Sequence, residues 1–127
     1  MSSGGAKLAP FEEIGHGFVR QYIKRMQESR DTLAGLYGPE SLLTWEGGKF
    51  KGASKIQEKM KSLPKLVYKI EKVDAQPMPA NAVLCLVVGK LKIDNDNPVN
   101  FIQAFTLLKN PAGSYYCHND IMRMIYG

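Results

Sequence analysis

The segment that tells most about the fold reads LLTWEGGKFKG, from Leu42 to Gly52. It contains the only tryptophan of the chain, Trp45, followed directly by Glu46 and a Gly-Gly pair. Two short runs on either side of a Gly-Gly turn predict a β-hairpin. Neighbouring side chains of a strand point to opposite faces, so Trp45 and Glu46 cannot both belong to the core. We therefore expect the end of this hairpin to present one of the two side chains at a rim or surface.

A long amphipathic helix is predicted ahead of the hairpin. Apolar residues recur at helical spacing from Phe11 to Met26. Pro10 suits the first turn of a helix, and Lys24 and Arg25 suit the negative end of the helix dipole. The pattern predicts about four to five turns with one apolar face.

Two shorter helices and four long strands account for the rest of the chain. We expect helices at residues 29–37 and 53–63, strands at 66–71, 83–93, 101–108 and 115–125, and turns at 74–81, 94–98 and 110–113. Strands joined by short turns are antiparallel. The predicted fold is α+β: a cone-shaped, strongly bent antiparallel sheet wrapped around the long N-terminal helix, with three helices in all and a cavity at the open end. Residues 10–127 are expected to form a single domain, and residues 1–9 a disordered tail.

Composition narrows the classes of protein to consider. The chain has 127 residues, enough for one domain with a real core. The two cysteines, Cys85 and Cys117, lie in apolar strand-like sequence, which favours buried free thiols over a disulfide and a cytosolic or nuclear location. The longest apolar run, Ala82 to Val88, is too short to cross a bilayer, and the first residues have no signal-peptide core. We therefore expect no membrane partner.

The net charge of +5 comes partly from a lysine cluster at positions 49, 51, 55, 59, 61 and 65. No aromatic-basic motif accompanies the cluster, so a solvated face is favoured over a nucleic-acid site.

The sequence lacks three common enzyme motifs. There is no phosphate-binding glycine loop, no metal-ligand spacing among the histidines and cysteines, and no hydrolase serine elbow. Asp94, Asp120 and Tyr22 are of the types that proton-transfer enzymes on cone-shaped folds use, but their spacing does not single them out. We expect no catalytic site, no metal and no cofactor.

Two carboxylates, Asp94 and Asp96, stand two residues apart on one predicted turn. If the hairpin end near Glu46 lies beside that turn, three carboxylates surround one spot on a basic protein. The alternative is an ordinary solvated turn, since aspartate and asparagine favour turns.

Several blocks of the sequence resemble the nuclear transport factor 2 family, in the order and nearly at the spacing of that family. They span Phe11 to Arg123 and comprise Leu43-Thr44-Trp45-Glu46-Gly47, Ser62-Leu63-Pro64, Asp74 with Gln76-Pro77, Val87-Val88-Gly89, Asp94 with Asp96, and Asn119-Asp120 with Arg123. The resemblance implies a homodimer formed through the sheet face. It also implies a carrier that binds the GDP form of the small GTPase Ran and the FxFG repeats of nucleoporins, in cytoplasm and nucleus and enriched at nuclear pores.

The same resemblance implies site residues. Glu46, Asp94 and Asp96 match acidic positions that pair with Ran, with Leu63 and Met122 beside them. Met122 stands where the family usually has phenylalanine. Trp45, Pro77 and Pro79 match the FxFG-binding site, which would need a half-exposed tryptophan, and Leu86 and Ile121 match the dimer face. Two other functions stay open: a small-molecule enzyme or binding protein on the same cone, and a repeat-binding adaptor without Ran.

Overall fold

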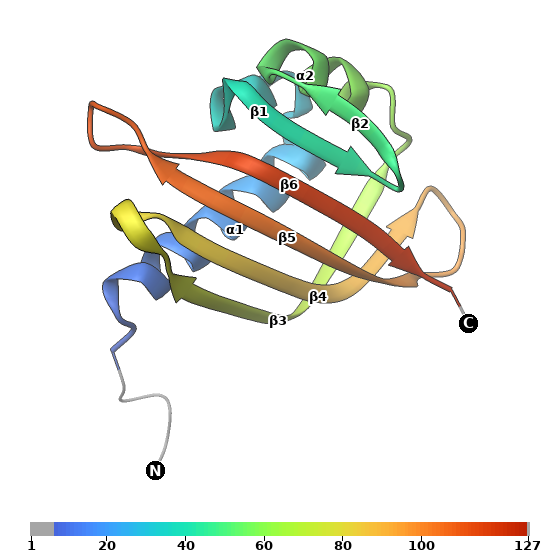
Figure 1. Cartoon of the computed structure of the whole chain (residues 1–127). Coiled ribbons are helices and arrows are strands. Elements are labelled where there is room, and N and C mark those ends of the chain that lie inside the picture. Colours follow the sequence, from blue (N-terminus) through green and yellow to red (C-terminus); the bar gives the residue numbers. More distant parts are fainter. Residues whose placement is uncertain (1–6, 127) are drawn as a thin grey trace.

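A computed structural model describes residues 7–126, in which one curled sheet packs around a long helix (Figure 1). The expected tail, residues 1–9, therefore lies largely outside the described residues. The elements follow in the order α1 (Pro10–Glu28), η2 (Arg30–Leu36), β1 (Tyr37–Trp45), β2 (Gly48–Lys51), α2 (Ala53–Lys61), β3 (Leu66–Pro77), η3 (Pro79–Asn81), β4 (Val83–Ile93), β5 (Val99–Lys109) and β6 (Tyr115–Ile125). The predicted helix-first, strand-later α+β order is confirmed, and η2 and η3 are 3₁₀ helices.

Helix α1 begins and ends as its sequence predicts. Pro10 occupies the first turn, and the Ala9 N–H donates to Glu12 Oε1 at 2.8 Å, which satisfies a free donor at the helix start. The apolar face buries Phe18, Tyr22 and Met26 against the sheet. Aromatic packing holds this layer together, for example between the Tyr22 and Phe105 rings, whose centroids lie 5.0 Å apart at an edge-to-face angle.

The six strands run in the spatial order β2-β1-β6-β5-β4-β3. The paired strands that a short turn joins along the chain are antiparallel, as their short connections predict. The expectation of a wholly antiparallel sheet is wrong at one pair, because β1 runs parallel to β6. No turn joins these two strands, so turn lengths carried no information about their direction. Figure 1 shows α1 crossing behind the sheet, which leaves the other sheet face open.

Two turns differ in position from the prediction. The β1–β2 turn is Glu46-Gly47 and not Gly47-Gly48: Trp45 pairs with Gly48, and φ is 48° at Glu46 and 90° at Gly47. Two positive φ angles in a two-residue hairpin turn match the right-handed twist of the strands. The expected turn at 74–81 is shorter, since β3 continues to Pro77 and only the segment around η3 reverses the chain.

The sheet bends sharply where β3 and β4 meet at Gly89. The pairing register shifts between Ile70 and Lys72, opposite this glycine. A Cβ at position 89 would overlap the carbonyl oxygen of Lys69, so only glycine permits the close approach. The irregularity is a bulge whose extra residue lies on β3.

Cys85 and Cys117 are free and buried, as expected. Within residues 7–126, no helix combines the length and apolar character needed to cross a membrane.

Candidate functional site

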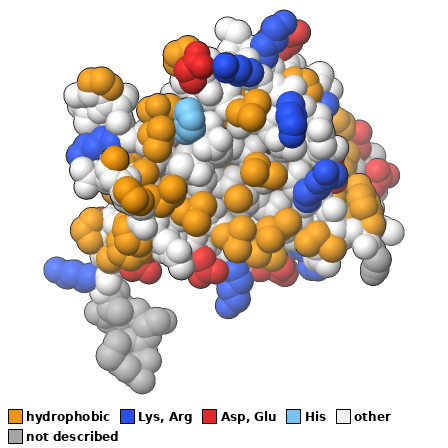
Figure 2. Space-filling model, viewed as in Figure 1, with side chains coloured by type: hydrophobic (Ala, Val, Ile, Leu, Met, Phe, Trp, Pro, Cys, Tyr) orange, Lys and Arg blue, Asp and Glu red, His pale blue; other side chains and the backbone are white. Residues whose placement is uncertain are grey.

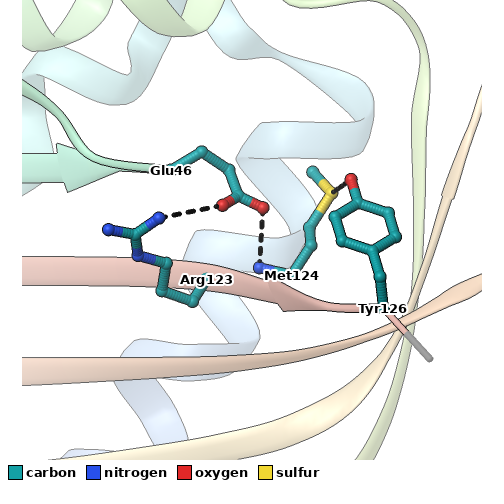
Figure 3. A network of polar contacts seen from close by, with 4 residues as sticks. All are labelled: Glu46, Arg123, Met124 and Tyr126. Carbon is teal, nitrogen blue, oxygen red and sulfur yellow. Dashed lines mark hydrogen bonds and ion pairs between the residues drawn. The ribbon is translucent and has the colours of Figure 1, made fainter.

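Glu46 is held firmly at the end of the sheet. Its Oε1 accepts a hydrogen bond from the Met124 N–H at 2.8 Å, and its Oε2 lies 3.5 Å from Arg123 Nη1 (Figure 3). The Glu46 N–H donates to the Met122 carbonyl at 3.1 Å. The Glu46 side chain keeps 28% exposure, so part of the carboxylate faces solvent. The backbone N–H of Met124 and the guanidinium of Arg123 thus fix the orientation of this carboxylate.

Asp94 and Asp96 occupy the β4–β5 turn and are both exposed. Asp94 adopts φ 51°, its Oδ1 accepts the Lys65 N–H at 3.2 Å, and its own N–H donates to the Lys65 carbonyl at 2.8 Å. The Asp96 N–H closes the turn onto the Ile93 carbonyl at 3.0 Å. These contacts fix the backbone and leave the Asp96 carboxylate free to meet a partner.

The strand register brings the three carboxylates to one end of the sheet. Trp45 pairs with Met122, and Met124 pairs with Phe101, which lies near the start of β5. The β1–β2 and β4–β5 turns therefore project from the same end, as Figure 1 shows. We call Glu46, Asp94 and Asp96 the acidic rim.

The two apolar residues expected beside the rim differ in exposure. Leu63 is half-buried against the core and follows α2. Met122 is 0% exposed and belongs to the core. Its partner in the parallel ladder is Trp45, and both side chains belong to the buried core. The hollows described on residues 7–126 lie elsewhere, and neither Met122 nor Glu46 lines them.

Trp45 does not present the half-exposed ring that an FxFG site would need. It is 6% exposed and belongs to the core, because β1 alternation turns Leu43 and Trp45 inward together. Pro77 pairs with Val83 at the other end of the sheet, so Trp45 and Pro77 do not form one site on this chain. The apolar spacing of Leu43 and Trp45 was the signal in the sequence that could have placed the tryptophan inside.

Pro77 instead lines a small apolar groove of about 250 Å³ between α1 and η3. Two aromatic residues, Phe11 and Tyr115, contribute to its walls, and the remaining lining residues are Pro10, Ile14, Met78, Asn81, Ala82 and Val83. The Tyr115 O–H donates to the Asn81 carbonyl at 2.8 Å, which ties η3 to β6. We call this hollow the α1–η3 groove. In the sequence Phe11 fits only the helical pattern, which carries no signal of this groove. Pro79 is exposed nearby in η3.

The open sheet face carries a row of apolar side chains. Leu86 pairs with Ala104, and Ala104 pairs with Ile121, so the three lie side by side on neighbouring strands. Leu86 is 38% and Ile121 50% exposed, and Figure 2 shows apolar side chains gathered across this face. Both residues predicted for a dimer contact thus lie in one exposed apolar patch.

The only carboxylate in the core is Asp120, among the residues that the structure describes. Its Oδ2 accepts the Tyr37 O–H and its Oδ1 accepts the Gln103 Nε2–H, both at 2.8 Å. Gln103 Nε2 also lies 3.0 Å from the Tyr22 hydroxyl. Burial raises the pKa of Asp120 to about 7, and the two hydrogen bonds lower it only in part.

This buried group brings together two of the three residues considered for proton transfer. Asp120 and Tyr22 meet through Gln103, while Asp94 lies on the exposed turn. Both Asp120 and Tyr22 are 0% exposed, so a substrate has no access to them in this structure. The arrangement suits a polar network that stabilises the core. Among the described residues, no group of His, Cys, Asp and Glu could hold a metal ion.

The nuclear transport factor 2 domain model matches residues 14–124. The chain belongs to the nuclear transport factor 2 family. Nuclear transport factor 2 of Emericella nidulans is 39% identical over 123 residues, covering 94% of this chain and 98% of that protein. Nuclear transport factor 2B of Arabidopsis thaliana is 38% identical, covering 91% and 94%. The predicted family is therefore confirmed.

The structure of nuclear transport factor 2 from Cryptosporidium parvum superposes with a TM-score of 0.87 at 38% identity, covering 95% of this chain and all of that one. The predicted cone fold of the nuclear transport factor 2 family is thus confirmed. These relatives carry the name of a transport factor and not that of an enzyme.

Proposed function

We propose that this chain is a non-enzymatic carrier in nuclear transport that binds the GDP form of Ran and FxFG-repeat nucleoporins as a homodimer. The observation that carries the proposal is the acidic rim: three carboxylates at one end of the sheet, on a chain with net charge +5. A basic protein that gathers acids at one place has a local site for a cationic partner. The proposed location is cytoplasm and nucleus, with enrichment at nuclear pores.

Ran binding is assigned to Glu46, Asp94 and Asp96. Carboxylates pair with lysine and arginine through charge-assisted hydrogen bonds, which favour recognition and association rate more than raw affinity. Screening at physiological salt limits distant charges to roughly 8 Å, so the rim outweighs the positive net charge for a docked partner. Leu63 supplies apolar contact next to Lys65, whose backbone holds Asp94. Met122 supports the rim from inside the core.

The test is Glu46→Lys. The new lysine faces Arg123, whose Nη1 now lies 3.5 Å from Glu46 Oε2, and it presents a cation to the basic partner. We expect calorimetry to show Ran-GDP affinity reduced at least about tenfold, since like charges in an interface cost several kcal/mol. Wild-type protein should bind Ran-GDP better than Ran-GTP.

The matched control is Glu40→Lys. Glu40 is an exposed β1 residue paired with Lys51, and the substitution changes the net charge equally. It should leave Ran affinity within a factor of about two. Equal losses in both variants would assign the effect to net charge and reject the acidic rim as the Ran site.

Repeat binding is assigned to the α1–η3 groove in place of the Trp45 ring. Phe11, Tyr115 and Pro77 offer flat apolar surfaces of the kind that phenylalanine rings of FxFG repeats would contact. A groove of about 250 Å³ suits a weak contact with a single ring. A dimer supplies two such grooves, so weak, fast contacts still give useful avidity.

The intact acidic rim argues against a repeat-binding adaptor without Ran. The closed environment of Asp120 gives no support to an enzyme on the same cone.

A further inference from the structure

The largest hollow described on the molecule lies between α1 and β3 and takes no part in the proposed carrier function. Its volume is about 620 Å³, and its lining residues are His16, Val19, Arg20, Ile23, Lys24, Gln27, Glu28, Ile70 and Val73. All of them come from two elements, so the hollow is a groove open to solvent along the helix. We call it the α1–β3 groove.

The groove has an apolar floor. Val19 and Ile23 lie four residues apart on α1 and share one face of the helix. Ile70 and Val73 of β3 face them across the groove. Val19 is buried, while Ile23, Ile70 and Val73 are half-buried and keep surface for a ligand.

One wall of the groove is basic. His16, Arg20 and Lys24 follow each other at four-residue spacing, so they form a stripe along α1 beside the apolar floor. Arg20 and Lys24 are exposed and take part in neither of the ion pairs found within residues 7–126. Glu28 continues the same spacing and places one acid at the far end.

We propose that the α1–β3 groove binds an acidic, partly apolar segment of a partner protein in extended conformation. The lining from His16 to Glu28 spans roughly 18 Å of helix, which an extended segment of about five or six residues covers. Its apolar side chains lie on the floor, and its carboxylates meet Arg20 and Lys24. Glu28 sets the direction in which the segment lies, because it repels an acidic end of the segment and accepts a neutral or basic end.

The side chains of the groove would bind this segment, and not backbone pairing with strand β3. β3 is the last strand of the sheet, so one of its edges has no neighbouring strand. At Tyr68, however, the edge N–H already donates to Gln27 Oε1 at 2.7 Å. Helix α1 thus occupies the edge of β3 at Tyr68, and the stripe and floor form the recognition surface.

The site is separable from the acidic rim by charge. The rim attracts cations and repels an acidic segment, whereas the α1–β3 groove does the opposite. Failure of one proposal therefore leaves the other intact.

The test uses the full chain and three fluorescein-labelled synthetic peptides that alternate acidic residues with leucine, lysine with leucine, and acidic residues with serine. Fluorescence anisotropy should show saturable binding of the acidic-leucine peptide alone, weakening with added salt. Amide shifts in NMR spectra should concentrate at Val19, Ile23, Ile70 and Val73. Absence of binding, equal binding of the lysine peptide, or shifts elsewhere would overturn the proposal.

Two charge-reversal variants decide whether the stripe is responsible. Arg20→Glu with Lys24→Glu should reduce affinity for the acidic peptide at least about tenfold. Lys55→Glu with Lys61→Glu changes the net charge equally on exposed positions of α2 and should have little effect. Equal losses of affinity in the two double variants would mean that net charge causes the effect, and would reject the site. Binding of anionic phospholipid vesicles through the stripe, without binding of the peptide, would reject a protein partner.

Discussion

At the residue scale, the environment of the buried carboxyl group of Asp120 determines its pKa. The carboxyl is buried with two donors, Tyr37 and Gln103, at 2.8 Å. Burial still dominates and raises its pKa to about 7, which is well above the value of roughly 3.9 in an unfolded chain. The folded state therefore favours the protonated form below about pH 7. Asp120 would contribute full stability below about pH 4 and lose that contribution as pH rises towards 7.

We predict that Asp120→Asn removes this pH dependence. For the wild type, the free energy of unfolding should fall by up to roughly 1.4 kcal/mol per pH unit between about pH 4 and 7. Asparagine keeps an acceptor for Gln103 and a polar group for Tyr37 but does not titrate. Urea unfolding across this range measures both slopes. Identical slopes in wild type and Asp120→Asn would contradict the assignment.

Substitutions at Trp45 and at Phe11 should affect different properties: the first the stability of the fold, the second the binding of FxFG repeats. Trp45 is 6% exposed, so Trp45→Ala leaves a core cavity and should cost about 3–5 kcal/mol of unfolding free energy. Phe11 is only partly buried in the α1–η3 groove, so Phe11→Ala should keep most of the stability and lose FxFG binding. Thermal unfolding and pull-downs with an FxFG peptide check the two effects. Retained FxFG binding in folded Phe11→Ala would place the repeat site elsewhere.

At the element scale, the sequence predicted those elements whose pattern is local. The α1 stripe, the β6 bounds at 115–125 and the β4–β5 turn all follow from periodicity or turn residues next to each other in the chain. The parallel contact of β1 with β6 depends on residues far apart in sequence, and no local signal specifies it. Strand β3 continues to Pro77 because Pro77 lies at the end of the outermost strand, where a missing N–H is tolerated.

The candidate site was predictable to the same degree. The acids of the rim stand in turns, which the sequence located, and the register then brought them to one end of the sheet. Exposure was harder to predict. Strand alternation puts Leu43 and Trp45 on one face of β1, and the covering of β1 by η2 and α2 makes that face part of the core.

Helix α1 approaches the sheet closely at Gly15, and a pair of substitutions tests this packing. A Cβ at Gly15 would lie 2.7 Å from Cys85 Sγ and 2.9 Å from Ala75 Cβ. At Gly17, two residues further on, the nearest atom is the flexible end of Arg20 at 3.8 Å. We predict that Gly15→Ala destabilises the fold by about 1–3 kcal/mol through overpacking. Gly17→Ala should stabilise it by roughly 0.5–1 kcal/mol, since alanine suits a helix interior better.

Urea midpoints of the two glycine variants give the measurement. The variants share one helix and one chemical change, so helix propensity cancels between them. If Gly15→Ala were as stable as Gly17→Ala, the close contact of α1 with β3 and β4 would be wrong.

At the scale of the whole molecule, surfaces of different chemistry lie on different sides of one small cone. The acidic rim occupies one end of the sheet, the basic α1–β3 groove follows the helix, and the apolar row of Leu86, Ala104 and Ile121 covers the open face. Separate surfaces would let one chain hold the proposed partners at the same time. The apolar face is the one that a second copy of the chain would cover.

We predict that Ile121→Asp converts a dimer into a folded monomer. Ile121 is 50% exposed and lies in one row with Leu86 and Ala104, so two copies that meet through this face would bury it. An aspartate there would be buried without a partner, which costs several kcal/mol per copy. Sedimentation should show half the wild-type mass, and circular dichroism should be unchanged because the side chain faces away from the core.

The control is Leu8→Asp, an exposed leucine ahead of α1 and outside the sheet. It changes the charge and removes an exposed aliphatic side chain in the same way, yet it should sediment as wild type. Ran-GDP binding adds a second readout: the acidic rim belongs to one chain, so the Ile121→Asp monomer should still bind Ran-GDP, with one partner for each chain. FxFG binding should weaken in the monomer, because the avidity of two grooves is lost. A variant that stays dimeric would mean that copies associate through another surface.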